Sequence, residues 1–213
     1  MSADEYPKRG RPRDPERMRR VLEAAARQFT ELGFERTSVD SVAQASGVSK
    51  MTVYSYFASK EALFEACIED RCSGLYDLFL NEQLDPRDPA GGLHQVGTLF
   101  LALMLADEVL AMHRMMFASA GVHEELCRGF YEEGPRVMVD HLAAYLGEAA
   151  RQGALAIGDP QRAADQFLAL FLGRAHIHAL LGLGKPDTAS DHAQIAANVA
   201  LFLKAYAPPL TAG

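Results

Sequence analysis

The stretch that decides the fold runs from Ser46 to Phe57 and reads SGVSKMTVYSYF. Its glycine, Gly47, is a residue type that ends helices, and Ser49 is one that favours the N-cap of the next helix. Val53 and Phe57 are four residues apart, so they share the inner face of that second helix. The stretch therefore predicts two short helices joined by a tight glycine turn.

The outer face of this second helix has one charge, two tyrosines and small hydroxyl side chains. Two short helices that rest on a longer one form a helix-turn-helix, whose second helix enters the major groove of DNA. Lysine and hydroxyl groups suit phosphate contacts, and a threonine methyl can meet a thymine methyl. The pattern by itself also fits a short amphipathic helix in an ordinary bundle. The outward residues are Lys50, Met51, Thr52, Tyr54, Ser55 and Tyr56.

A longer helix is predicted ahead of this pair. Asp14 supplies a capping carboxylate and Pro15 fits the first helical position. Gly33 favours the end of that helix, and Ser38 begins the next one with a capping-box-like pattern. Apolar residues at helical spacing lie between these signals: Met18, Leu22, Ala25, Phe29 and Leu32.

Two stretches carry a resemblance to a known family. Residues 33–43 read GFERTSVDSVA and residues 46–63 read SGVSKMTVYSYFASKEAL. Together they closely resemble the DNA-binding domain of the tetracycline-repressor family, over about residues 14–66. Met51 departs from the pattern, because glycine is common there in the family. The resemblance implies an all-α protein with an N-terminal three-helix DNA-binding domain and a larger C-terminal helical domain that dimerises and binds a ligand.

The resemblance also implies roles for individual residues. Thr37 and Ser38 correspond to phosphate contacts at the start of the second helix. Met51, Thr52 and Ser55 are placed to meet base edges, and Tyr54 could contact either bases or phosphates. The remaining expected phosphate contacts are Ser49, Lys50, Tyr54, Tyr56 and Lys60.

A basic segment, KRGRPR at residues 8–13, precedes the helices. It looks like the core of an AT-hook, in which Arg11 and Arg13 would enter the minor groove. A flexible basic tail that adds only non-specific attraction is the alternative. The net charge of −7 is unevenly spread: residues 1–60 carry 11 Lys and Arg against 8 Asp and Glu, and residues 61–213 carry 10 against 20. One end of the chain is therefore suited to face phosphates.

The whole chain of 213 residues reads as about nine helices with no sustained strand pattern. We expect a flexible arm at 1–13, the DNA-binding domain at 14–60, the helical ligand-binding and dimerisation domain at 61–206, and a tail at 207–213. A linker at 85–92 separates a fourth helix, reaching about Leu80, from later helices. These are expected at about 93–105, 107–118, 124–150, 160–182 and 190–206, with a kink or split at Gly134-Pro135.

The last two expected helices, 160–182 and 190–206, resemble the dimerising helices of the family; an internal core of one monomer is the alternative. A homodimer would match a palindromic operator, since the two symmetries must agree. The resemblance implies a repressor that a small apolar or amphipathic effector releases from DNA. Flexible methionines and aromatic residues in the middle helices suit an adaptable pocket, although they also suit a core. The expected ligand-binding residues are Phe100, Met104, His113, Met116, Phe117, Phe130, Tyr131, Phe171 and His178.

Other classes of protein fit less well. A metal or redox sensor could use Cys67, Cys72 and Cys127 with the histidines, but their spacing gives no shared metal face. An all-helical enzyme or carrier would need a catalytic constellation, and no paired carboxylates, nucleophile elbow or phosphate loop is visible. We therefore expect no enzyme, cofactor or metal. The lack of a signal peptide or a membrane-spanning apolar run leads us to expect a cytoplasmic protein without a membrane partner.

Overall fold

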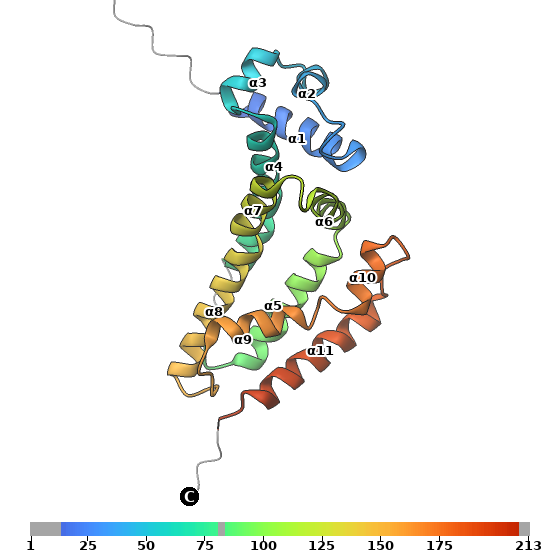
Figure 1. Ribbon diagram of the computed structural model, residues 1–213. Helices are drawn as coiled ribbons and strands as arrows, with labels where there is room; N and C mark the ends of the chain where they lie inside the picture. Colours follow the sequence, from blue (N-terminus) through green and yellow to red (C-terminus); the bar gives the residue numbers. More distant parts are fainter. Residues whose placement is uncertain (1–13, 81–83, 209–213) are drawn as a thin grey trace, which may run out of the picture. The chain divides into compact units, whose positions relative to one another are not determined.

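The computed structural model describes residues 14–80 and 84–208, with the side chains of 71–80 left aside. This part of the chain is all helical, as predicted, and contains eleven helices rather than about nine (Figure 1). They are α1 (Pro15–Leu32), α2 (Val39–Ser46), α3 (Lys50–Tyr56), α4 (Lys60–Leu80), α5 (Pro89–Met104), α6 (Asp107–Ser119), α7 (Glu124–Glu133), α8 (Pro135–Arg151), α9 (Pro160–Ala169), α10 (Arg174–Leu180) and α11 (Thr188–Ala205).

The chain divides into two compact units, Met1–Cys67 and Ile68–Gly213. In the first unit, α1 packs on both α2 and α3, as expected of a helix-turn-helix. Its core is aromatic at one end, where the Phe64 ring meets the rings of Phe29 and Phe34 edge to face. Val53, on α3, is also fully buried.

Capping residues explain where the helices of this first unit begin and end. The Asp14 carboxylate accepts a hydrogen bond from the Glu16 amide at the start of α1. Ser38 and Ser41 form a reciprocal capping box at the start of α2. Gly47, which follows α2, has φ 65°, a left-handed conformation that glycine adopts without steric cost. The local sequence, and Gly47 in particular, therefore favours the turn between α2 and α3.

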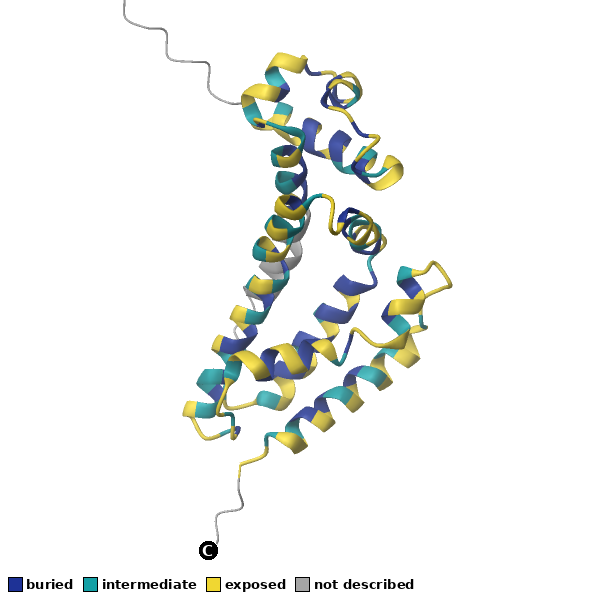
Figure 2. Ribbon diagram, viewed as in Figure 1, coloured by how far each residue is buried: buried dark blue, intermediate teal, exposed yellow. Residues whose placement is uncertain are grey.

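The second unit has a single apolar core, to which α5, α8, α9 and α11 contribute (Figure 2). Helix α5 packs on α11, α8 on α9 and on α7, and α6 on α10. Gly97 on α5 allows a close approach, because a Cβ there would lie 2.8 Å from the ring of Phe171. That phenylalanine is fully buried and packs edge to face against Phe100 and Phe167.

Two sequence-based boundaries need correction, and a third is confirmed. The single helix expected at 160–182 is broken between α9 and α10, where the Leu170 carbonyl accepts a hydrogen bond from Asn198 of α11 and Gly173 is extended. The expected linker at 85–92 is partly helical, because Asp88 caps α5 and Pro89 occupies its first turn. The segment 124–150 is split at Gly134, as predicted.

Among the described helices, none is by itself long and apolar enough to cross a membrane. Helices α5 and α6 would satisfy length and composition together, but they are bent by 66° at the break between them.

Candidate functional site

Helix α3 is held in place by its own first residues. The Ser49 hydroxyl accepts a hydrogen bond of 3.2 Å from the Thr52 amide and lies 2.8 Å from the Thr52 hydroxyl. The Ser55 hydroxyl donates to the Thr52 carbonyl at 2.7 Å. Local hydrogen bonds thus involve the small hydroxyl groups of the predicted DNA-binding face, while the burial of Val53 packs the helix onto the rest of the unit.

The face of α3 opposite Val53 is open to solvent. Met51 is 79% exposed and Tyr54 is 43% exposed, and both Lys50 and Ser55 are exposed. A methionine this exposed contributes nothing to the core of the unit. The exposure therefore agrees with a surface that another molecule covers.

The ammonium of Lys50 is already paired in the free protein. Its Nζ lies 2.7 Å from Oδ1 of Asp40, in the first turn of α2. The hydrogen bond that Lys50 donates to the Asp40 carboxylate raises the pKa of Lys50. The pair joins the two helices of the motif and also places a carboxylate beside the predicted phosphate contact.

Three other predicted DNA contacts are engaged with the protein backbone. Thr37 is buried and its hydroxyl donates to the Gly33 carbonyl at 2.9 Å. The Tyr56 hydroxyl donates to the Asp14 carbonyl at 3.3 Å. The Lys60 ammonium donates to the Phe34 carbonyl at 3.0 Å and lies 4.2 Å from the centre of its ring. Arg11 and Arg13 lie outside the described residues.

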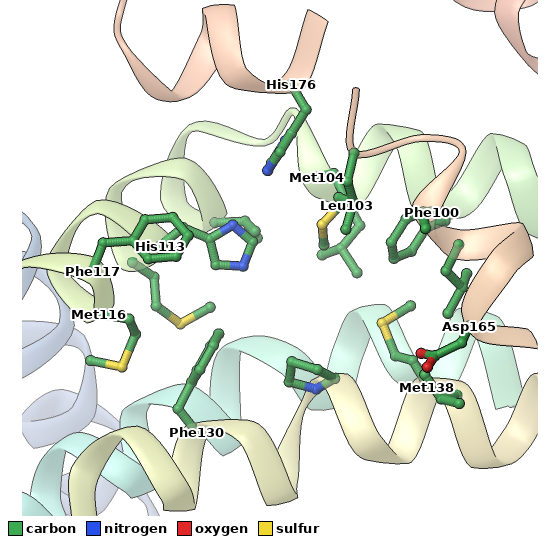
Figure 3. A pocket seen from close by; sticks show the side chains of 17 residues that line it. Phe100, Leu103, Met104, His113, Met116, Phe117, Phe130, Met138, Asp165 and His176 are labelled. Atoms are coloured by element: carbon green, nitrogen blue, oxygen red, sulfur yellow. The ribbon is translucent and has the colours of Figure 1, made fainter. Parts of the chain in front are cut away.

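The second unit contains a pocket of about 340 Å³ between α5, α6, α7, α8, α9 and α10 (Figure 3). Most of its wall is apolar, and the methionine sulfurs and aromatic rings face a common space. Of the residues expected to bind a ligand, the structure brings these together on the wall: Phe100, Met104, His113, Met116, Phe117 and Phe130.

The other three expected ligand residues lie elsewhere. Tyr131 is 55% exposed, His178 is exposed, and Phe171 belongs to the core beside Gly97. Sequence reasoning missed the polar residues His176 and Asp165, which line the pocket. His176 is two residues from His178 on α10, so the two side chains lie on different faces, and His176 is the one that is buried. Met112 and Met138, which also line the pocket, are among the middle-helix methionines that the sequence indicated for an adaptable pocket. The apolar residues also missed are Leu103, Val109, Pro135, Val139, Leu168, Ala169 and Leu172.

The two histidines of the pocket have lowered pKa values. Burial, with a smaller contribution from the neighbouring His176, lowers the pKa of His113 to about 4. Burial also lowers the pKa of His176, and a hydrogen bond with the Met104 backbone opposes this in part. At neutral pH both rings are therefore uncharged. The Nδ1 atom of His176 is buried and has no hydrogen-bond partner.

The cysteines show little sign of a reactive centre. Cys67 is buried and its sulfur lies 3.6 Å from the Leu22 carbonyl oxygen, while the sulfur of Cys127 lies 3.9 Å from the Met116 carbonyl oxygen. The side chain of Cys72 lies outside the described residues. Within residues 14–80 and 84–208 there is no group of three or more His, Cys, Asp or Glu side chains suited to a metal ion.

Helices α1 to α3 have the arrangement of a helix-turn-helix DNA-binding unit. The second unit contains a largely apolar pocket of the kind that binds small molecules. Comparison with known proteins specifies the family. Residues 21–67 match the family described as bacterial regulatory proteins, tetR family, and residues 91–208 match the AefR-like transcriptional repressor C-terminal domain. The chain belongs to the TetR family of transcriptional regulators. Members of this family bind DNA as dimers and typically respond to a ligand.

Individual relatives agree with this. A solved structure of the flavonoid-responsive regulator FrrA is similar, with a TM-score of 0.78, 35% identity, and coverage of 93% of this chain and 100% of that one. A TetR-family regulator from Mesorhizobium loti MAFF303099 also has a TM-score of 0.78, at 28% identity, covering 90% of this chain and 97% of that one. YhgD of Bacillus subtilis (strain 168) is 42% identical over 50 residues, 24% of this chain and 26% of that protein.

Proposed function

We propose that this protein is a homodimeric repressor that binds a palindromic operator and leaves it when a small apolar or amphipathic molecule enters the pocket of the second unit. The observation that carries the proposal is the pocket of about 340 Å³ inside the region that matches a repressor C-terminal domain. Pockets of this size and largely apolar lining are typical of small-molecule sites.

For the DNA contacts, we propose that the exposed residues of the motif meet the operator. Ser38, Ser49, Lys50 and Tyr54 would contact phosphates, and the side chains of Met51, Thr52 and Ser55 would face base edges. The hydroxyls of Thr37 and Tyr56 would first have to give up their backbone hydrogen bonds, whereas the Lys60 ammonium has two further N–H donors. We therefore assign Thr37 and Tyr56 the role of fixing the helices, with phosphate contact as a secondary role, and Lys60 both roles. Arg11 and Arg13 would extend the contact into the minor groove.

For the dimer, we propose that a second copy covers apolar side chains on and around α10 and α11. Large apolar residues on a surface commonly mark an interface, and a homodimer buries the same patch twice. This region is where the sequence predicted the dimerising helices. Its exposed residues, with exposed fractions from 41% to 68%, are Leu172, Ile177, Leu181, Leu183 and Leu201.

The pocket and this surface share a mechanical connection through α6 and α10. Helix α6 contributes Val109, Met112, His113, Met116 and Phe117 to the pocket wall. From the same helix, Arg114 donates hydrogen bonds to two carbonyls at the end of α10, those of Ala179 and Leu180, at 2.8 and 2.6 Å. A ligand that moves α6 would therefore move α10. Such a ligand shifts the population only if it binds the DNA-incompetent arrangement more tightly.

The name of one similar protein suggests which class of effector to screen first. FrrA is described as flavonoid-responsive and is 35% identical over 93% of this chain. Flavonoids are flat aromatic molecules, and the pocket offers aromatic and methionine side chains to stack against. We propose flavonoids as the first compounds to test.

The test is a gel-shift titration of the full-length protein on DNA from upstream of its own gene, at several salt concentrations, with and without each flavonoid. We expect specific retardation of a fragment containing an inverted repeat, and loss of it with an effective compound. No preference for any such fragment over random DNA would remove the DNA half of the proposal. Specific binding that no compound in a broad screen alters would remove the effector half only.

A further inference from the structure

The pocket has one polar feature that its apolar wall does not explain. His176 on α10 is only 5% exposed, yet its Nδ1 atom has no hydrogen-bond partner. A buried polar atom without a partner is costly, and such atoms are rare in native proteins. The ring points into the pocket, toward the side of the pocket that holds His113 (Figure 3). The atom is thus available to whatever occupies the pocket.

His113, on α6, borders the same part of the pocket. Its ring centre lies 5.8 Å from that of His176, with the ring planes at 82°, and 5.8 Å from the ring centre of Phe130. Burial keeps both imidazoles uncharged at neutral pH. A neutral imidazole has one donor and one acceptor nitrogen, so it can hydrogen-bond to a ligand but offers no net charge to pair with.

We propose that His176, assisted by His113, forms a hydrogen-bonding subsite for a hydroxyl group on an otherwise apolar, uncharged effector. A hydroxyl can donate and accept, so it satisfies Nδ1 in either tautomer of the ring. An anionic group is disfavoured, because the imidazoles are neutral and the carboxylate of Asp165 lies on the same pocket wall. This inference rests on the proposed ligand site and specifies what that site recognises.

The experiment compares three ligands of one shape: naphthalene, 2-naphthol and 2-naphthoate. Binding to the full-length protein at pH 7.5 is followed by the intrinsic fluorescence of the compounds. We expect 2-naphthol to bind about 5- to 10-fold more tightly than naphthalene, the equivalent of one added hydrogen bond. We expect 2-naphthoate to bind more weakly than either.

Variants test whether the preference for 2-naphthol over naphthalene depends on His176. His176→Leu should reduce the affinity for 2-naphthol to that for naphthalene while leaving naphthalene binding intact. The matched control is His141→Leu, an exposed histidine on α8 that does not line the pocket; it should keep the preference. If His176→Leu does not fold, the ¹⁵N chemical shifts of the His176 ring in the unmodified protein give the answer. They should move on adding 2-naphthol and much less on adding naphthalene.

The outcomes distinguish failure of the hydroxyl subsite from failure of the proposed ligand site. If 2-naphthol and naphthalene bind equally, or if the preference survives His176→Leu, the subsite is overturned and the pocket remains; a water molecule then satisfies Nδ1. If 2-naphthoate binds most tightly, the uncharged character of the subsite is overturned. If none of the three compounds binds, both the subsite and the proposed ligand site are overturned.

Discussion

The DNA-binding face of α3 and the pocket of the second unit differ in how their polar groups are satisfied. On α3, hydroxyl groups bond to neighbours within the helix, and Lys50 is paired with Asp40. In the pocket, Nδ1 of His176 has no partner. Binding DNA would therefore rearrange existing hydrogen bonds on α3, whereas binding a ligand in the pocket would add a bond that Nδ1 of His176 lacks. A ligand should accordingly stabilise the protein more per hydrogen bond than DNA does.

The two regions also differ in how far apart in the sequence their parts lie. The recognition helix and its cap occupy Ser49 to Phe57, while the pocket draws on residues from Phe100 to His176. A substitution in α3 should therefore act on the first unit alone, and one in the pocket should act through several helices. The predictions below test this difference, beginning with the largest expected effect.

Val53→Asp should unfold the DNA-binding unit while the second unit stays folded. Val53 is fully buried on α3, and a carboxylate there would have no partner, at a cost of about 4 kcal/mol or more. Calorimetry should show loss of one transition, and gel shifts should show loss of DNA binding. Ala45→Asp, on the exposed side of α2, is the control for added charge. Simultaneous loss of ligand binding would contradict the independence of the two units.

Stability should fall as the pH decreases from about 6.5 to about 4. The pKa of His113 in the folded protein, about 4, is below its ordinary value of 6.5, so in this range the unfolded chain binds the additional proton. The penalty is absent above pH 6.5 and grows to at most about 3 kcal/mol near pH 4. Denaturant titrations across this range should show the decrease, and His113→Leu should reduce its slope. An unchanged slope in the variant would assign the decrease to other groups.

Arg114→Gln should destabilise the second unit by about 2 kcal/mol and weaken the effect of ligand on DNA binding. The variant loses charged hydrogen bonds to the carbonyls of Ala179 and Leu180. Arg128→Gln is the comparison, because it removes only an exposed pair with Glu124, expected to contribute under about 1 kcal/mol. Thermal unfolding and effector titrations on operator DNA measure the two effects. If the ligand weakens DNA binding by Arg114→Gln as much as it does for the unmodified protein, the proposed connection between α6 and α10 is wrong.

Asp40→Asn should strengthen binding to DNA of any sequence by a few-fold at low salt, because it frees the Lys50 ammonium for phosphate. Lys50→Ala should weaken binding and lower the slope of log affinity against log salt by about 1. Filter binding over a salt series measures both. If Asp40→Asn binds DNA less well, the pair serves mainly to hold α3 in place.

The sequence predicted features that depend on neighbouring residues better than features that depend on residues distant in the chain. Asp14-Pro15, Gly33 and Gly47 act on residues next to them, so the helices of the first unit were correctly placed. The break before α10 was missed; the Leu170 carbonyl there accepts a hydrogen bond from Asn198, which is distant in the sequence. On α10, His176 is buried and His178 is exposed, and composition could not distinguish these two histidines. Six of the expected ligand residues do share one wall, because methionines and aromatic residues were already concentrated in the middle helices.

The ion pair between Asp40 and Lys50 has a consequence for how the protein finds its operator. Genomic DNA presents a vast excess of wrong sites, and each moment spent on one delays arrival at the right one. Because the lysine of the recognition helix is paired with a carboxylate, it attracts random phosphate less strongly, and the protein would leave such sites a few-fold sooner. Contacts to base edges at the operator would offset that loss. The ion pair would thus shorten the time that the regulator spends on wrong sites during its search.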